Sequence, residues 1–190
     1  MEFPDELHGQ RLVLRRTAPK WETAQSIFAA VDSDREHLEP WFPWAPMTRK
    51  SEDTMKYLFD KEDDTGKVEY GINIDGSFAG TIAVMNIDTE ARAGELGYWL
   101  SSSFTRKGYM TEAVRTIEKA FFGSLGFNRL FLKCDSRNKA SQGVARKCGY
   151  AHEGTHRQDE YSTYFGDLRN TMYFSKLQEE YKNGKDDGPQ

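Results

Sequence analysis

The stretch that most constrains the fold lies at residues 97–154. In it, apolar strand residues, a basic glycine turn, a helical pattern, a second strand and a second helical pattern follow in order. The turn reads Arg106-Lys107-Gly108, and the first helical pattern begins directly after it. A helix N-terminus presents unpaired backbone N–H groups and the positive end of the helix dipole, so it suits a phosphate group. Gly108 lets the backbone approach an anion because it carries no Cβ atom. The stretch therefore predicts a phosphate or pyrophosphate site between a strand and a helix.

Composition favours one domain with a good-sized core. The chain has 190 residues, of which 37% are hydrophobic and 13% aromatic. We expect one domain over residues 1–182 and a disordered polar tail over residues 183–190. The formal net charge of −4 gives no support for nucleic-acid binding. No apolar run is long enough to cross a bilayer and the N-terminus lacks a signal-peptide pattern, so we expect a cytoplasmic protein with no membrane partner.

The two cysteines, Cys134 and Cys148, fall in an expected strand and an expected helix. Neither belongs to a metal-ligand spacing, so we expect no metal site. Reduced thiols are typical of a cytoplasmic protein. A disulfide between the two cysteines is the less favoured alternative.

Hydrophobic patterning predicts an α+β domain. Strands are expected at residues 11–16, 68–75, 78–87, 94–100, 129–134, 150–157 and 169–177. Asp75-Gly76-Ser77 is typical of a hairpin turn between the second and third of these strands. The strand at 129–134 arrives after a helical crossover, so we expect it to lie parallel to its neighbour.

Apolar residues at intervals of three and four predict helices at residues 20–31, 110–121 and 138–148. Ser51 is expected to cap a further helix whose apolar side is Met55, Leu58 and Phe59. Between the helix at 20–31 and the helix that Ser51 is expected to cap, three prolines surround three aromatic residues at 40–46, which predicts a stiff aromatic loop.

Several motifs together resemble one enzyme family. They are Gly97-Tyr98-Trp99-Leu100, Lys107-Gly108-Tyr109-Met110-Thr111-Glu112-Ala113, Asn128-Arg129, Asn138-Lys139-Ala140-Ser141, Gly149-Tyr150 and Glu153-Gly154. In combination they are similar to the acetyl-CoA core of the GNAT superfamily of N-acetyltransferases. Within it they resemble the RimJ/RimL group, which acetylates protein N-termini such as those of ribosomal proteins. The resemblance implies a central, mixed and mostly antiparallel sheet with two splayed parallel strands and flanking helices.

The resemblance implies acetyl-CoA as the cosubstrate. The family's pyrophosphate loop corresponds to residues 105–110, where Thr105 and Met110 depart from the family's pattern while the backbone amides stay available. The pantetheine arm is implied to lie between the splayed strands and to pair with strand backbone as an added strand would. Backbone N–H groups near Tyr98 and Leu100 would polarise the thioester oxygen. The implied cofactor-binding residues are Trp99, Leu100, Ser101, Arg106, Lys107, Gly108, Tyr109, Met110, Thr111, Asn138, Lys139 and Ser141.

Two of these residues open the second helical pattern. Asn138 resembles the family asparagine that hydrogen-bonds the cofactor, and a plain helix N-cap is an equally favoured and compatible alternative. Many family members have a tyrosine seven residues later that protonates the departing thiolate, but this chain has Ala145 there. Ser141 resembles the substitute hydroxyl of the RimL-like subgroup, so the resemblance implies Ser141 as the general acid. The alternative is a solvent-facing helix serine.

Acyl transfer to an amine needs the amine in its neutral form. A protein α-amino group has a pKa of about 7.7–8.0, so a modest base suffices, directly or through water. Glu160 matches the RimL-like position proposed for that base. Asp159 is its rival, and for both residues the alternative is an exposed loop carboxylate. Glu95, inside a strand, is a third candidate for substrate contact or for the base.

The aromatic loop at residues 41–44 lies where the superfamily shapes its acceptor pocket. The implied substrate residues are therefore Trp41, Trp44 and Glu95, and the alternative for the tryptophans is that their rings fill the core. We expect an enzyme that acetylates a protein N-terminal α-amine. The alternatives are acetylation of a small amine, such as an aminoacyl-nucleotide antibiotic, and a non-catalytic CoA-binding sensor. The sequence leaves open whether the protein is a monomer or a homodimer.

Overall fold

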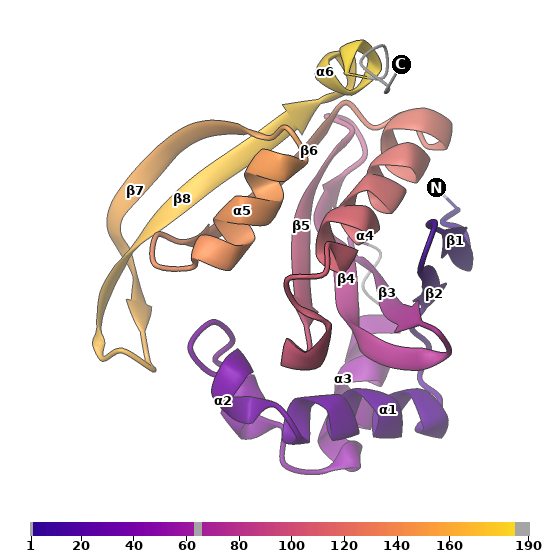
Figure 1. Cartoon of the computed structure of the whole chain (residues 1–190), viewed down its shortest axis with the longest axis vertical. Coiled ribbons are helices and arrows are strands. Elements are labelled where there is room, and N and C mark those ends of the chain that lie inside the picture. The colour runs from indigo at the N-terminus through magenta and orange to yellow at the C-terminus, as the bar shows by residue number, and fades with distance from the viewer. Residues whose placement is uncertain (1, 63–65, 185–190) are drawn as a thin grey trace.

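The computed structural model describes residues 2–62 and 66–184 and places them around one eight-stranded sheet (Figure 1). The strand order is β1-β2-β3-β4-β5-β6-β8-β7, in which β5 and β6 are parallel and all other neighbours are antiparallel. This mixed, mostly antiparallel sheet confirms the predicted fold class. The strands are β1 (Glu6–His8), β2 (Val13–Arg16), β3 (Val68–Ile74), β4 (Ser77–Asp88), β5 (Ala93–Leu100), β6 (Arg129–Asp135), β7 (Ala151–Ser162) and β8 (Asp167–Leu177).

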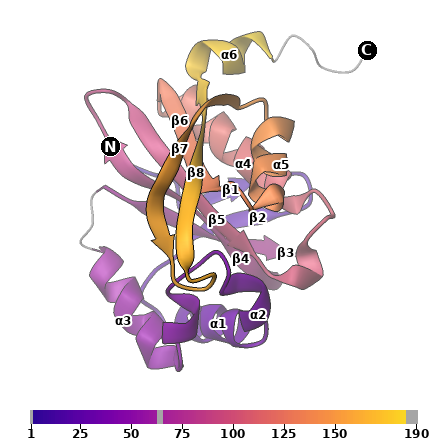
Figure 2. The ribbon, with the colours of Figure 1, turned by 90° about the vertical axis from the view of Figure 1, so that its left-hand side faces the viewer.

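Helices pack against both faces of the sheet (Figures 1 and 2). One hydrophobic cluster joins the sheet to α4 and α5 and includes Val114 and Ala145. A second cluster joins the other face to α1 and α3 and includes Ile27, Leu58 and Trp99. The helices are α1 (Trp21–Asp32), α2 (Arg35–Leu38), α3 (Ser51–Glu62), α4 (Tyr109–Glu118), α5 (Lys139–Lys147) and α6 (Gln178–Asn183).

The hairpin between β3 and β4 follows the sequence prediction. Asp75 and Gly76 both have positive φ, of 48° and 79°. A two-residue turn with two left-handed residues is type I′, whose twist matches that of the flanking strands. The prediction of a hairpin at Asp75-Gly76-Ser77 is therefore confirmed.

The β7–β8 hairpin is longer than the sequence predicted. The expected strands ended at 157 and began again at 169, whereas β7 continues to Ser162 and β8 begins at Asp167. Gln158 has a left-handed φ of 52°, and the register shifts between His156 and Glu160. This bulge, in a strand that is exposed along most of its length, removes the alternating pattern that marks a strand. Glu160 consequently lies on a strand and not in a loop.

Two predictions about α3 need correction. Phe59 is not on its apolar side, because 55% of the residue is exposed while Leu58 is fully buried. Ser51 is the first helical residue and not the cap. The carboxylate of Asp53 instead accepts hydrogen bonds from the backbone N–H groups just before the helix, at 2.9 and 3.1 Å. An acidic residue in the first turn also complements the helix dipole.

Both ends of the chain add elements that the sequence did not predict. β1 pairs antiparallel with β2, which is itself shorter than the expected strand at 11–16. Asn183 ends α6 rather than beginning a tail. The rest of the predicted tail, from residue 185 onward, lies outside the described residues.

Cys134 and Cys148 are both buried and free, in agreement with the expected thiols. In the part of the chain that the structure describes, no helix combines the length and apolar character needed to cross a bilayer.

Candidate active site

β5 and β6 start side by side and then separate. Among the described residues, their parallel pairing is confined to 93–95 of β5 and 129–131 of β6. Beyond this point β5 stays paired with β4 as far as Leu100, and β6 stays paired with β8 as far as Asp135. The facing edges of β5 and β6 therefore part within the sheet, as the family resemblance implied. We refer to this opening as the β5–β6 gap.

Backbone groups of Tyr98 and Leu100 point into the β5–β6 gap. Ser101 donates its N–H to the carbonyl of Ala79 in β4, at 2.8 Å. Because successive residues of a strand direct their N–H and C=O groups to opposite neighbours, Trp99 also pairs toward β4. Tyr98 and Leu100 then present their backbone groups on the side where β6 has moved away. An extended ligand that entered the gap would find donors and acceptors there.

Side chains of β5 divide the surroundings of the gap into two faces. Tyr98 and Leu100 pack with the cluster of α4 and α5, whereas Trp99 belongs to the cluster of α1 and α3. Strand side chains alternate, so Glu95 lies on the same face as Trp99. We call the side of Tyr98 the α5 face and the side of Trp99 the α1 face.

A tethered loop leads from β5 to α4. Asp34, between α1 and α2, accepts hydrogen bonds from the Ser102 backbone N–H at 2.5 Å and from its hydroxyl at 2.8 Å. Further on, Arg106 and Gly108 take left-handed φ angles of 60° and 84°, and α4 begins at Tyr109. Left-handed residues next to a helix N-terminus bring successive N–H groups together, which makes an anion-binding concavity.

Arg11 contacts three residues at the start of α4 and holds this turn in place. Its Nε pairs with Glu112 Oε2 at 2.8 Å, and its Nη1 donates to the Lys107 carbonyl at 3.1 Å. The guanidinium also lies 4.6 Å from the centre of the Tyr109 ring. Met110 is only 8% exposed and belongs to the core, so its backbone is the part that can serve a ligand.

The first turn of α4 is joined to the end of α5. Half-buried Thr111 accepts a hydrogen bond through its carbonyl from the Cys148 thiol at 3.7 Å. Arg115, one turn later, donates to the Lys147 carbonyl at 3.1 Å. These contacts hold α4 and α5 as neighbours on the α5 face.

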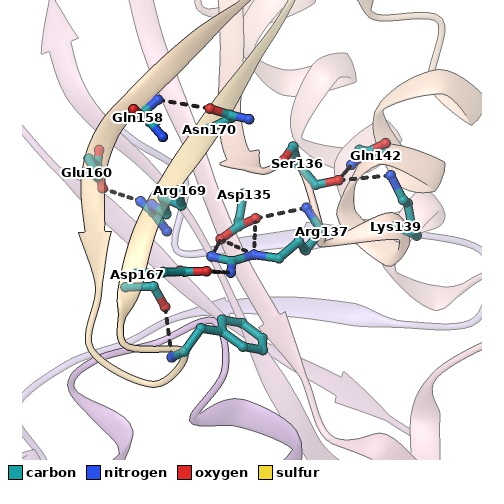
Figure 3. A network of polar contacts seen from close by, with 12 residues as sticks. Asp135, Ser136, Arg137, Lys139, Gln142, Gln158, Glu160, Asp167, Arg169 and Asn170 are labelled. Atoms are coloured by element: carbon teal, nitrogen blue, oxygen red, sulfur yellow. Dashed lines mark hydrogen bonds and ion pairs between the residues drawn. The ribbon is translucent and has the colours of Figure 1, made fainter.

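The start of α5 is fixed by a set of short hydrogen bonds (Figure 3). Asn138 is the N-cap, and its Oδ1 accepts from the Ser141 backbone N–H at 3.0 Å. The carbonyl of Ser136 accepts from Lys139 Nζ and from Gln142 Nε2, both at 2.8 Å. The capping role predicted for Asn138 is confirmed. These bonds place Ser141 firmly in the first turn of α5.

The side chain of Ser141 faces β5 and is not a solvent-facing helix serine. Its Oγ lies 3.1 Å from the phenol oxygen of Tyr98, and its carbonyl oxygen lies 3.4 Å from the same atom. Burial raises the pKa of Tyr98, so its phenol stays protonated at neutral pH. Burial also raises the pKa of the neighbouring Cys134 thiol, against a hydrogen bond with Ser141 that acts to lower it. Three protonated groups from β5, β6 and α5 thus meet on the α5 face.

Charged side chains of β6, β7, β8 and the turn after β6 gather on the opposite face (Figure 3). Arg169 of β8 forms an ion pair with Glu160, which lies directly opposite it on β7. Arg137 donates to Asp135 at 2.6 Å and to Asp167 at 2.9 Å. Burial acts to raise the pKa of Asp135, but the hydrogen bonds from Arg137 hold it below its usual value. Alternation along β6 and β8 puts Asp135 and Arg169 on the α1 face.

The three candidate bases differ in exposure and in partners. The side chain of Glu160 is 42% exposed, and that of Asp159 is 21% exposed with its carboxylate 3.6 Å from His156 Nδ1. Glu95 is buried and accepts a hydrogen bond from Asn86 Nδ2 at 2.9 Å. Glu160 is therefore the carboxylate that an incoming molecule reaches most readily.

Aromatic rings connect the loop after α2 with β5 and with the tip of the β7–β8 hairpin. The Trp44 ring lies 6.2 Å from that of Trp99, and the Trp41 ring lies 6.1 Å from that of Phe165. The Arg137 guanidinium stacks over Phe165 at 4.1 Å. Neither tryptophan is fully buried, so both rings remain available at the border of the α1 face.

The sequence of the chain matches the acetyltransferase (GNAT) domain family over residues 11–151. This chain belongs to the GNAT acetyltransferase family. The acetyltransferase is 27% identical over 182 residues to YdaF of Bacillus subtilis, which is provisionally named a ribosomal N-acetyltransferase. That similarity covers 93% of this chain and 97% of YdaF.

Two solved structures share the fold of the acetyltransferase. RimL, a ribosomal L7/L12 alpha-N-protein acetyltransferase in complex with coenzyme A, has a TM-score of 0.84 at 22% identity, covering 92% of this chain and 99% of RimL. MccE, a microcin C7 self-immunity acetyltransferase in complex with acetyl-CoA and AMP, has a TM-score of 0.80 at 21% identity, covering 88% of this chain and 93% of MccE. The likeness to both confirms the fold.

Sequence reasoning about the acetyltransferase missed two partners of its candidate residues. Tyr98 has the pattern of an ordinary core residue, and nothing in the sequence shows that its phenol reaches Ser141. Arg169 could be paired with Glu160 only once the register of β7 and β8 was known. Because β7 has a bulge between His156 and Glu160, its sequence does not show which residues of β8 lie opposite it.

Proposed function

We propose that this acetyltransferase transfers the acetyl group of acetyl-CoA to the α-amine of a protein N-terminus, with a ribosomal protein as the favoured acceptor. The observation that carries the proposal is the β5–β6 gap, which has the Ser141 hydroxyl on its α5 face and the Asp135 carboxylate on its α1 face, where Glu160 lies on the same face of the sheet two strands away from β6. The names of YdaF and RimL support this class of acceptor. A ribosomal acceptor also implies a cytoplasmic reaction.

The residues around the gap fit acetyl-CoA, which would supply the activated acetyl thioester. Backbone groups of Tyr98 and Leu100 would pair with the amides of its pantetheine arm. The N–H groups from 106 to 111 would bind its diphosphate. Gly108 supports this fit, because its φ of 84° is a left-handed conformation that residues with a Cβ atom rarely adopt. The exposed Lys139 adds a positive charge at the start of α5.

Glu160 and Ser141 would handle the two protons of the reaction. An α-amine has a pKa of about 7.7–8.0, so Glu160 needs only to take one proton, directly or through water, as the amine attacks the thioester. Ser141 would donate a proton to the departing thiolate. Because Glu160 is on the α1 face and Ser141 on the α5 face, the acceptor would approach from the α1 face. No covalent intermediate on the enzyme is required.

Exposed apolar side chains near the hairpin tip favour a polypeptide acceptor. Tyr164 and Phe165 at the tip are 53% and 42% exposed, and the Phe165 ring contacts Arg137 of the charged cluster. A small amine is the second candidate, since the contact between the Trp41 and Phe165 rings reduces the space for an acceptor on the α1 face. The fold likeness to MccE agrees with that second candidate.

Release of free thiol from acetyl-CoA tests the proposal. N-terminal peptides of ribosomal proteins should support turnover, and aminoacyl-nucleotides and polyamines serve as the competing acceptors. Turnover with small amines alone would move the assignment to the second candidate. Ser141→Ala and Glu160→Gln should keep affinity for coenzyme A but lose turnover. If wild-type protein binds acetyl-CoA and accepts no amine from either set, a CoA-binding sensor replaces the enzyme.

A further inference from the structure

We propose that Tyr98 is a positioning residue for Ser141, so that a pair of hydroxyl groups, and not the serine alone, serves the departing thiol. This inference rests on the proposed function and deepens it. The pair joins two separate elements, because Tyr98 belongs to β5 at the edge of the gap and Ser141 belongs to the first turn of α5.

Two contacts define the arrangement of the pair. The phenol oxygen of Tyr98 lies 3.1 Å from Ser141 Oγ and 3.4 Å from the Ser141 carbonyl oxygen. The Ser141 backbone is itself held, since its N–H donates to Asn138 Oδ1 at 3.0 Å. Only the χ1 rotation of Ser141 is then left to set, and the Tyr98 phenol sets it.

The count of protons decides what the phenol does. A serine hydroxyl has one proton to give and can accept two hydrogen bonds. The Tyr98 phenol also has one proton, and the shorter contact, 3.1 Å to Oγ against 3.4 Å to the carbonyl oxygen, favours donation to Ser141 Oγ, which leaves the seryl proton free for another acceptor. Burial raises the pKa of Tyr98, so the phenol keeps the proton that this donation requires.

A hydrogen bond donated by Tyr98 to Ser141 also suits the proton transfer itself. The Ser141 O–H bond breaks, the S–H bond of the departing thiol forms, and the seryl oxygen gains negative charge. The Tyr98 hydrogen bond stabilises that oxygen until it takes a proton from solvent. Ala145, one turn further along α5, is fully buried and has no hydroxyl, and burial keeps the nearby Cys134 thiol protonated. Tyr98 thus brings a phenol into contact with the Ser141 hydroxyl at this place.

Tyr98→Phe tests the inference because it removes the hydroxyl and keeps the ring. We expect kcat to fall by about tenfold with KM for acetyl-CoA and calorimetric affinity for coenzyme A unchanged. Tyr70→Phe is the control: Tyr70 is fully buried, whereas Tyr98 is half-buried, and the Tyr70 phenol donates to the Pro4 carbonyl at 3.0 Å, away from the gap. The control should keep the wild-type kcat.

A double mutant separates positioning from general packing. In a Ser141→Ala background, Tyr98→Phe should cause no further loss of kcat, because the group it positions is gone. An additive loss, or a loss of affinity for coenzyme A, would show a structural role and overturn the inference. A wild-type kcat for Tyr98→Phe, with a reduced kcat for Ser141→Ala, would overturn the inference alone. A wild-type kcat for Ser141→Ala would remove both the proposed acid and its positioning residue.

Discussion

Glu160 and Arg169 face each other across the β7–β8 ladder and form an ion pair. The carboxylate proposed as the base is therefore held in place by a guanidinium on the neighbouring strand, while 42% of its side chain stays exposed. Such a fixed and accessible carboxylate suits a base that meets its substrate on the surface of a sheet.

Glu160→Gln should lower kcat by about 100-fold, because general-base help is worth at least that much when the amine must lose a proton. KM for acetyl-CoA should stay the same, since the change is on the α1 face. Initial rates of thiol release measure both values. Glu153→Gln is the control: Glu153 is also on β7 and ion-paired, to Arg129 at 2.6 Å. Equal losses of kcat in Glu160→Gln and Glu153→Gln would mean that a change anywhere in β7 lowers kcat, and that Glu160 is not the base.

Gly108→Ala should weaken binding of acetyl-CoA several-fold and destabilise the fold by about 1–2 kcal/mol, because the residue has a left-handed φ of 84°. Gly123→Ala provides the comparison, since a Cβ atom there meets nothing within 4 Å. Calorimetry with coenzyme A and denaturant unfolding give the two quantities. Unchanged affinity in Gly108→Ala would argue against the diphosphate lying at the start of α4.

Asn138→Ala should cost about 1 kcal/mol of stability, because it removes the acceptor for the Ser141 N–H. Asn138→Asp keeps that acceptor and should retain the wild-type free energy of unfolding. Urea denaturation compares the three proteins. Equal destabilisation by Ala and Asp would mean that the cap is not the source of the effect.

Lys176→Met should destabilise the fold by about 3–5 kcal/mol, because it leaves the buried carboxylate of Glu118 without its cation at 3.3 Å. Burial raises the pKa of Glu118 even with Lys176 present. A group with a raised pKa in the folded state stabilises at low pH and loses that contribution as pH rises through this pKa. The loss in Lys176→Met should thus be larger at pH 8 than at pH 5, as measured by urea denaturation. A loss independent of pH would exclude the bare carboxylate as its cause, and adding Glu118→Gln should recover stability.

The central part of the fold could be predicted because local signals and tertiary structure agree there. Asp75-Gly76 has the chemistry of a type I′ turn, and Gly108 and Asn138 mark the starts of α4 and α5. Each of these residues acts through its own backbone or its nearest neighbours. The sequence therefore contained the information needed to place them.

The parts that escaped prediction depend on partners far along the chain. β7 is exposed along most of its length and bulged at Gln158, so it lacks the alternation of a half-buried strand. The contact between Tyr98 and Ser141 joins residues 43 positions apart and depends on how α5 packs against β5. Phe59 has an apolar side chain on an exposed position, which periodicity alone cannot identify.

Amide hydrogen exchange of β5, with and without acetyl-CoA, tests the central claim most directly. The amides of Tyr98 and Leu100 point into the β5–β6 gap, whereas those of Trp99 and Ser101 are already paired toward β4. Acetyl-CoA should slow exchange at Tyr98 and Leu100 and leave Trp99 and Ser101 almost unchanged. Unaltered exchange at Tyr98 and Leu100 under saturating acetyl-CoA would contradict the placement of the cosubstrate in this gap.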